Sequence, residues 1–278
     1  MKKCGFVAVI GETNAGKSTL INKLVGQKVS IVSRKVQTTL SRILGIAIYG
    51  DSQVILADTP GFVSDSQESA LEKTAWDAFR ESEQVLFIVD ANKKNFSRSA
   101  ALIKKIHKEK KVSLVLNKVD LVHKPKLLEI AEMFSQIRTF ENVFMISSTT
   151  GVGVDAIQKY LEKSVPEGEW LFPEEEITDL SFEKFVAEIT REHLYHRVHK
   201  EIPYRCKVET VDYENKSDGS VVIEQHIYVA SEAHRAILIG HQGGKIKAIG
   251  EASREELSQL LDRKVHLFLQ VVLQDDKR

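Results

Sequence analysis

Eight residues near the N-terminus, GETNAGKS at 11–18, combine two glycines with a lysine and a serine. Gly11 and Gly16 allow a turn in which successive backbone N–H groups point at phosphate oxygens. Lys17 can then reach the terminal phosphates of a nucleotide, and the Ser18 hydroxyl can ligate Mg²⁺. This spacing therefore predicts binding of a nucleoside triphosphate with magnesium. The loop residues expected to bind nucleotide are Gly11, Asn14, Ala15, Gly16, Lys17, Ser18 and Thr19.

A second motif could act on the same phosphates. QVILADTPG (53–61) is an apolar run that ends in Asp58 and Gly61. Asp58 is expected to hold Mg²⁺ through water, and the Gly61 amide is expected to sense the γ-phosphate. The next residue, Phe62, can neither donate nor accept a hydrogen bond, so it cannot orient an attacking water as a glutamine would. We therefore expect slow hydrolysis without stimulation.

Two later motifs indicate which base is bound. VSLVLNKVD (112–120) and FMISSTTG (144–151) each end an apolar run with polar residues. A carboxylate at Asp120 can accept both N–H donors on the Watson–Crick edge of guanine, which adenine does not offer, and Lys118 can lie along the ring. The predicted nucleotide is therefore GTP. The residues expected to form the base pocket are Asn117, Lys118, Asp120, Ser147 and Ser148.

These polar groups need a scaffold that brings them to one place. Each follows a short apolar run of the kind that forms a buried strand, and KSTLINKLVG (17–26) shows helical spacing that ends at a glycine. In open α/β sheets, ligands bind at the carboxyl ends of the parallel strands. We therefore predict an α/β domain with a mostly parallel sheet, helices on both of its faces, and the nucleotide at the strand ends.

Charge is unevenly distributed along the 278 residues, although the formal net charge is +0. Residues 167–180, EGEWLFPEEEITDL, hold six acidic residues and no basic ones. An acidic, proline-containing stretch between two patterned regions indicates a linker. We therefore predict a nucleotide domain at 1–166, an acidic linker at 167–180 and a second domain at 181–278.

The second domain shows a helix–strand–strand–helix–helix–strand order. A capping serine opens a helical pattern at 181–202, and alternating strands at 204–214 and 220–230 flank an Asp-Gly turn. Helices are expected at 231–240 and 243–261, and a last strand at 264–273. The α-β-β-α-α-β order predicts a type II KH domain, an α+β fold that binds single-stranded RNA.

A second glycine-rich loop joins the two later helices of this domain. Gly240 and Gly243 flank His241 and Gln242, and the loop lacks both a preceding strand and the Lys-Ser pair of a nucleotide loop. This GxxG spacing is typical of KH loops, which clamp about four nucleotides of single strand. The residues expected to bind RNA are Arg235, Ile239, Gly240, His241, Gln242, Gly243, Gly244, Lys245, Ile246 and Lys247.

The motifs together resemble one family closely. SIVSRKVQTTLSRILG (30–45), followed by DTPG, NKVD and SSTTG, resembles the switch and base motifs of the Era GTPases within the Ras-like superfamily, and EIPYRCKVE (201–209) resembles the entry to the first strand of their KH domain. The resemblance covers nearly the whole chain. One departure is that His241 and Gln242 stand where KH loops often carry a lysine or arginine.

The resemblance implies several roles that the residues alone do not establish. Thr39 would close on Mg²⁺ and the γ-phosphate, with Thr38 as the competing choice, so that Lys17, Thr39 and Gly61 serve catalysis and Ser18, Thr39 and Asp58 serve Mg²⁺. Related GTPases with asparagine in the place of Asn14 bind K⁺ beside the phosphates; the alternative is that this side chain braces the loop.

The resemblance also implies partners. The KH domain would bind the 3′ end of small-subunit ribosomal RNA, and the GTPase would act in maturation of the 30S subunit. No apolar run approaches the length of about 18 residues that spans a bilayer, and Cys4 and Cys206 suit a reducing compartment. We therefore expect a monomeric cytoplasmic protein that can also associate peripherally with the inner membrane.

Two other classes of function remain open from the sequence. One is a metabolic P-loop kinase that transfers phosphate to a small molecule, against which the NKVD motif argues. The other is a signalling or membrane-associated GTPase whose KH-like domain binds protein. Absence of phosphoryl transfer to any acceptor but water would exclude the kinase, and loss of RNA binding in the double substitution Gly240→Asp with Gly243→Asp would exclude the protein-binding class.

Overall fold

The computed structural model describes residues 1–32, 43–59, 80, 82–198 and 202–274. The chain divides into two compact units, Met1–Asp179 and Leu180–Arg278. Each unit has its own hydrophobic clusters of buried side chains. Each is therefore described by itself.

The first unit is built on a six-stranded sheet with the order β2-β3-β1-β4-β5-β6. Its central strands are almost continuously buried, which apolar runs such as FVAVIG and VLFIV favour in a parallel sheet covered on both faces. Only β2 runs antiparallel to its neighbour. The mostly parallel sheet is confirmed. The strands are β1 Lys3–Gly11, β2 Ile43–Tyr49, β3 Ser52–Asp58, β4 Gln84–Asp90, β5 Lys111–Asn117 and β6 Val143–Met145.

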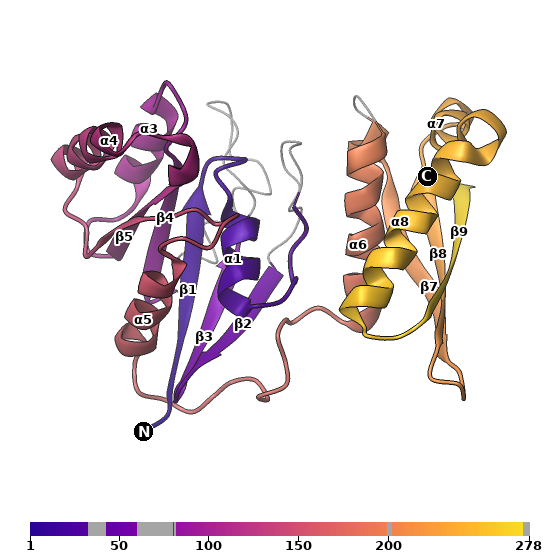
Figure 1. Ribbon diagram of the computed structural model, residues 1–278, viewed down its shortest axis with the longest axis horizontal. Coiled ribbons are helices and arrows are strands. Elements are labelled where there is room, and N and C mark those ends of the chain that lie inside the picture. The colour runs from indigo at the N-terminus through magenta and orange to yellow at the C-terminus, as the bar shows by residue number, and fades with distance from the viewer. Residues whose placement is uncertain (33–42, 60–79, 81, 199–201, 275–278) are drawn as a thin grey trace. The chain divides into compact units, whose positions relative to one another are not determined.

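Helices cover both faces of this sheet (Figure 1). Apolar residues of α1 (Lys17–Val25) and α5 (Val154–Ser164) share one core cluster with the strands. Those of α3 (Ser97–Lys105) and α4 (Lys124–Ile137) share the other cluster. A short 3₁₀ turn at Val119–Leu121 follows β5. The arrangement confirms the expected α/β fold.

The register of the strands brings their polar ends together. Val9 pairs with Asp58, so β1 reaches the phosphate loop as β3 ends. Asp90 pairs with Asn117, so β4 and β5 end side by side. The groups at these ends therefore occupy one edge of the sheet, the edge at which open α/β sheets bind ligands.

The acidic stretch after α5 packs against the first unit. Ile46 N donates to Ile177 O at 2.8 Å, and Leu44 N donates to the Asp179 carboxylate at 2.9 Å, so this stretch pairs with the edge strand β2. Gln53 in β3 accepts hydrogen bonds from the backbone N–H groups of residues 171 and 172, and donates to the carbonyl of residue 172 at 2.8 Å. The boundary between the units falls after Asp179, so nearly all of the predicted linker belongs to the first unit and lies along the edge of its sheet.

Replacing Gln53 with leucine is expected to lower the free energy of unfolding of the first unit by about 2 kcal/mol or more, because two backbone N–H groups lose their acceptor beside a fully buried side chain. Chemical denaturation of the full chain measures the change. The exposed Gln136→Leu is the control and should leave stability nearly unchanged. Equal stability of the two variants would contradict the prediction.

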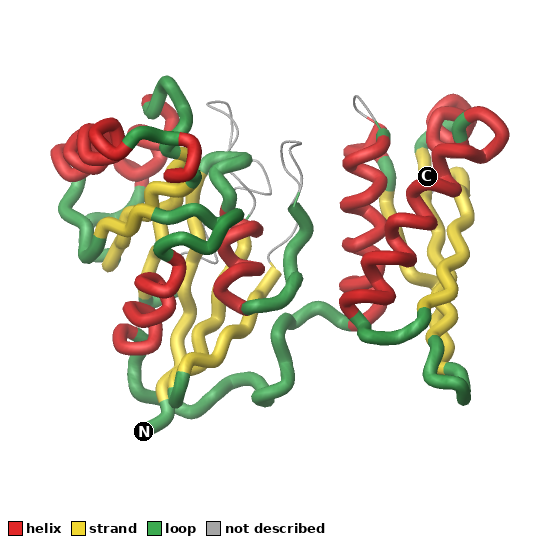
Figure 2. The backbone as a smooth tube through the Cα atoms, in the orientation of Figure 1, coloured by secondary structure: helices red, strands yellow, loops and turns green. Residues whose placement is uncertain are grey.

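The second unit has the predicted element order (Figure 2). Strand β8 lies between β7, which is antiparallel to it, and β9, which is parallel to it. Buried residues of the helices and strands form two adjoining clusters. The expected KH-type α+β fold is confirmed. Its elements are α6 Phe182–Arg197, β7 Lys207–Asn215, β8 Val221–Val229, α7 Glu232–Ile239, α8 Gly244–Leu260 and β9 Val265–Leu273, with 3₁₀ turns at Ile202–Arg205 and His241–Gly243.

Helix α6 begins as the sequence predicts and ends earlier. The Ser181 hydroxyl accepts a hydrogen bond from Lys184 N, the N-cap contact that a serine favours. The helix ends at Arg197 because Val198 takes extended backbone angles and is fully buried against the core. The helical pattern up to residue 202 therefore overestimates the length of this helix.

Candidate functional site

The phosphate loop connects β1 to α1, and its carbonyl groups surround the ammonium of Lys17. Lys17 is buried, and its ammonium donates to Gly11 O at 3.2 Å and to Glu12 O at 3.0 Å. Gly16 precedes the helix with a φ of 101°, in the left-handed region. A Cβ at Gly11 would lie 2.4 Å from Ile88 O, so the close approach of β4 also requires glycine there. Thr19 lies half-buried on α1.

Asp58 and Ser18 meet beside this loop, as a magnesium site requires. Asp58 is fully buried at the end of β3, and its Oδ2 accepts from Ser18 Oγ at 2.7 Å and from Ser30 Oγ at 2.5 Å. Hard oxygen donors of this kind suit Mg²⁺. Two hydroxyls that converge on one buried carboxylate also provide the partial positive charge that a cation would otherwise supply. The residues therefore fit the ion. The sequence showed no reason to select Ser30.

Asn117 joins the phosphate loop to the base loop. Its side chain is buried, and Nδ2 donates to Ala15 O at 2.8 Å. Its Oδ1 accepts from the backbone N and the hydroxyl of Ser148, at 2.9 and 3.0 Å. A Cβ at Gly16 would lie 2.2 Å from the same Nδ2. Asn117 therefore fixes two loops that the sequence places far apart.

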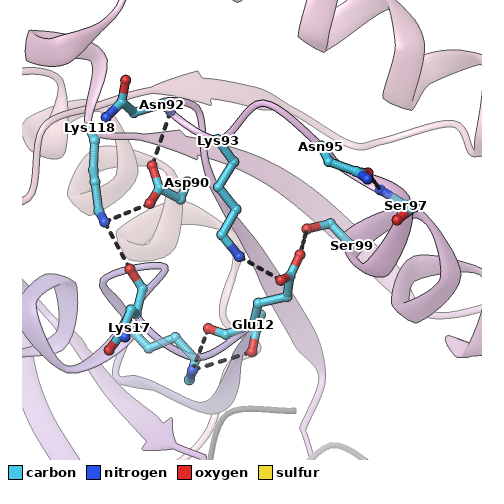
Figure 3. Close-up of polar contacts among 11 residues, drawn as sticks. Glu12, Lys17, Asp90, Asn92, Lys93, Asn95, Ser97, Ser99 and Lys118 are labelled. Carbon is cyan, nitrogen blue, oxygen red and sulfur yellow. Dashed lines mark hydrogen bonds and ion pairs between the residues drawn. The ribbon is translucent and has the colours of Figure 1, made fainter. Parts of the chain in front are cut away.

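Lys118 is held at the other end of the phosphate loop. Its ammonium donates to Asn14 O at 2.9 Å and forms an ion pair with Asp90 at 2.6 Å (Figure 3). Strand order brings Asp90 to this place, because β4 ends at Asp90 beside β5, which ends at Asn117. Asp90 orients the lysine that is expected to lie along the base.

Two other predicted base-pocket residues make local contacts. Asp120 is exposed within the 3₁₀ turn that follows β5, a position open to a ligand. The Ser147 hydroxyl accepts a hydrogen bond from Thr150 N at 3.2 Å, within its own loop. The structure thus joins Asn117 and Ser148 directly, while Asp120 and Ser147 lie on the adjoining turns.

Glu12 carries a second polar network that the sequence did not indicate. Its carboxylate, within the phosphate loop, accepts from Lys93 Nζ at 2.5 Å and from Ser99 Oγ (Figure 3). Burial alone would raise the pKa of Glu12, but the hydrogen bonds from these two residues lower it overall. The carboxylate is therefore charged and tied to the segment between β4 and α3.

Burial makes Lys17 sensitive to pH. Desolvation lowers the pKa of Lys17 to about 8, against the opposing effects of nearby Asp58 and Glu12. Bound phosphates favour the charged form and would raise this pKa, so affinity is complete below it and falls as pH rises. We expect nucleotide affinity to drop about tenfold between pH 7 and pH 9. Equilibrium titration with a fluorescent GTP analogue tests this, and a flat profile would contradict it.

The loop between α7 and α8 has the backbone shape of a clamp. Gly240 has φ 74° and ψ 178°, a combination that only glycine adopts readily, and a Cβ there would lie 2.8 Å from Lys245 Cβ. Gly243 (φ 74°) is left-handed, and Gln242 also has a positive φ of 48°. Gly244 begins α8 with helical angles and has open space around it. The exposed His241 and Gln242 form the tip.

The remaining predicted RNA contacts surround this loop. Lys245 Nζ donates to Ile237 O at 2.9 Å and braces the turn. Arg235 on α7 pairs with Glu232 at 3.2 Å, and Lys247 on α8 lies 4.0 Å from Glu251. Ile239 and Ile246 are partly buried against the core cluster and line the base of the loop. Three cationic residues, of which Lys247 is exposed and the other two are half-buried, and a glycine-rich turn therefore share one end of the unit, next to the start of a 17-residue helix.

Several predicted groups lie outside the described residues: Thr38, Thr39, Gly61 and Phe62. Within the ranges that the structure describes, His, Cys, Asp and Glu side chains form no cluster that could hold a metal ion by themselves. Over the same ranges, no helix has the length and apolar character needed to cross a membrane.

Comparisons with protein families agree with this arrangement. The model of a family described as 50S ribosome-binding GTPase matches residues 6–118, and the KH domain model matches residues 201–277. GTPase Era of Brucella suis is 46% identical over 99% of this chain and 89% of its own length. GTPase Era of Caulobacter vibrioides is 45% identical over 99% of this chain and 92% of its own length.

Solved structures are similar over the same extent. A crystal structure of Era in complex with MgGDPNP and nucleotides 1506–1542 of 16S ribosomal RNA has a TM-score of 0.90 and 33% identity, covering 99% of this chain and 95% of that one. A variant of Aquifex aeolicus Era bound to GDP·AlF4⁻ has a TM-score of 0.90 and 34% identity, with the same coverage.

Proposed function

Because the chain belongs to the Era family of GTPases, we propose that it is a GTP-binding and GTP-hydrolysing switch that binds the 3′ end of small-subunit ribosomal RNA through its KH domain. It acts in maturation of the 30S subunit. The observation that carries this function is one chain with both a phosphate loop tied to a guanine-type base loop and a GxxG clamp. Neither a small-molecule kinase nor a protein-binding module needs this combination.

The reaction is attack of water on the γ-phosphate of GTP. We assign Lys17 to the phosphates, Asn117 and Lys118 to the base side, and Asp120 to the guanine edge. Ser18 and Asp58 would hold Mg²⁺, together with Thr39. The ion would neutralise charge that develops on the phosphates. Lys17 lies beside the buried Asp58 and Ser18 pair, so the chain places a fixed positive group where this charge develops.

Potassium dependence is a finer proposal. Asn14 adopts a left-handed conformation with φ 62°, which turns the loop outward at the residue whose carbonyl Lys118 contacts. A K⁺ ion held beside the phosphates would add positive charge in the transition state. Single-turnover hydrolysis is then expected to be faster in K⁺ than in Na⁺ buffer, and the difference should vanish in Asn14→Ala. Equal rates in the two buffers would refute this proposal.

The oligomeric state and the location of the protein are further proposals. We propose that the protein is monomeric, that it works in the cytoplasm, and that peripheral membrane association is secondary to RNA binding. We assign GTP binding to the unit Met1–Asp179 and RNA binding to the unit Leu180–Arg278. Sedimentation without lipid vesicles tests whether the protein is monomeric, and sedimentation with vesicles tests whether it associates with membranes.

The RNA-binding role is tested at Gly244. This residue is exposed, has helical angles and open surroundings, and begins α8, so aspartate fits there without strain. An aspartate at this position would nevertheless repel a bound phosphate. Gly244→Asp is expected to weaken binding of a short RNA copying the 3′ end of 16S ribosomal RNA by about tenfold or more. Gly244→Ala is the matched control and should bind nearly as wild type does.

The same RNA titration tests the switch. It is performed at fixed salt with a non-hydrolysable GTP analogue and again with GDP. Tighter binding in the GTP form is expected, because in the proposed switch GTP favours the RNA-binding state, and RNA would then tighten GTP binding by the same factor. Equal binding in both forms would remove the coupling but keep the RNA role. Unchanged binding by Gly244→Asp would place the RNA elsewhere.

A further inference from the structure

The Glu12 carboxylate occupies an unexpected place in a loop that binds polyphosphate. Glu12 is 8% exposed, and its main-chain carbonyl accepts from the phosphate lysine, Lys17, at 3.0 Å. A negative side chain in this loop would repel a bound polyphosphate, and the repulsion would grow as solvent is excluded. The loop therefore needs a countercharge if it is to bind an anion of several charges.

Lys93 supplies that countercharge from a different part of the fold. It lies in the segment between β4 and α3, and its ammonium is 2.5 Å from Glu12 Oε2 with about a third of the side chain exposed. The Ser99 hydroxyl, buried on α3, donates to the other carboxylate oxygen. Figure 3 shows both donors reaching Glu12 from the same side of the loop.

The Glu12–Lys93 pair acts electrostatically on Lys17, the lysine that is expected to bind phosphate. Glu12 raises the pKa of Lys17 and Lys93 lowers it, although burial has the largest effect on that group. Asp90, the last residue of β4, directly precedes this segment and accepts a hydrogen bond from Lys118, which also donates to Asn14 O. The end of β4 and the segment after it thus contact the phosphate loop near its beginning and, through Lys118, near its middle.

We propose that Lys93 is a positioning residue of the GTP site: it neutralises Glu12, and with Ser99 it holds the first turn of the phosphate loop, so that the loop discriminates in favour of the more highly charged nucleotide. This inference rests on the proposed GTPase function. If the Glu12–Lys93 pair only stabilised the fold, its loss would lower the affinity for GTP and for GDP equally. If the pair sets the local charge, its loss lowers the affinity for GTP more, because the γ-phosphate adds negative charge.

The test measures dissociation constants for a fluorescent GTP analogue and for fluorescent GDP, with full-length variants. Lys93→Ala removes the ion pair and leaves Glu12 with the Ser99 hydrogen bond and the charge of Arg98 alone, so it is expected to weaken the GTP analogue about tenfold and GDP about threefold. Glu12→Gln should bind both at least as well as wild type. The double variant, Lys93→Ala with Glu12→Gln, should recover affinity to within about threefold of wild type, since neither charge remains. Lys94→Ala, an exposed neighbour, is the control.

Lys93→Arg and Lys93→Met separate charge from packing. The arginine variant should keep the preference for the GTP analogue, and the methionine variant, which keeps most of the aliphatic stem but not the charge, should lose it. Equal losses for both nucleotides, no recovery in the double variant, or an unchanged Lys93→Ala would each overturn the inference. If wild-type protein bound neither nucleotide, the proposed function would fail instead.

Discussion

Replacing Lys17 with alanine is expected to lower the rate of GTP hydrolysis about 10³-fold. The substitution removes the ammonium that the phosphate loop itself holds in place and with it the positive charge at the phosphates. Single-turnover hydrolysis at saturating GTP measures the chemical step. Lys23→Ala, an exposed lysine in the last turn of the same helix, is the matched control and should keep its rate.

The size of this effect follows from how the lysine is held. Lys17 is buried, its stem packs inside the loop, and its ammonium already satisfies two loop carbonyls. Little reorganisation is needed to point it at phosphates, and fixed charges of this kind stabilise a transition state most effectively. The Lys17→Ala variant should also lose the affinity change between pH 7 and pH 9. A rate within about threefold of wild type would show that other groups carry the charge.

Replacing Asn117 with aspartate is the second large effect, and it acts on affinity. The aspartate keeps an oxygen that accepts the hydrogen bond from Ser148. It loses the N–H group that donates to Ala15 O and places a negatively charged oxygen next to that carbonyl, which repels it. We expect affinity for both GTP and GDP to fall about 10²-fold, in proportion to the cost of a buried, unsatisfied pair of polar groups. Equilibrium titration with fluorescent nucleotides measures it.

The pattern across nucleotides separates the two kinds of defect. Asn117→Asp displaces a loop that every guanine nucleotide contacts, so GTP and GDP should lose affinity equally. Lys93→Ala alters charge near the γ-phosphate, so GTP should lose more. Asn95→Asp is the control, because its side chain accepts a hydrogen bond from Ser97 N and aspartate can do the same. A normal affinity in Asn117→Asp would mean that the two loops are held by other contacts.

The sequence alone predicted the elements that depend on neighbouring residues. The strand ends at Gly11, Asp58 and Asn117 could be found because apolar runs and the residues that follow them are local signals. The same holds for the GxxG loop, where glycine types at Gly240 and Gly243 correspond to positive φ values in the structure. The helix order around that loop was likewise visible from spacing and caps.

The acidic stretch shows what composition leaves undecided. Six acidic residues and a proline indicated a linker, and the backbone of this stretch pairs with the edge of β2 and with the Gln53 side chain. Charged side chains can face water while their own backbone groups satisfy a sheet edge, so composition does not decide whether such a segment is bound. Gln53 is more than a hundred residues from its partners, and no local pattern joins them.

What the sequence determined by itself is the chemistry of each motif and the element that carries it, because both depend on residue types within a few positions. Only the tertiary structure decided which polar groups meet: Glu12 with Lys93, Lys118 with Asp90, and Asp58 with Ser30. The first two pairs follow from strands that are neighbours in the sheet, and the third joins the end of β3 to the loop after α1. The sequence does not distinguish these carboxylates from exposed ones, because burial is a property of the fold. Burial then requires a partner, and that partner is decided by the fold rather than by neighbours in the chain.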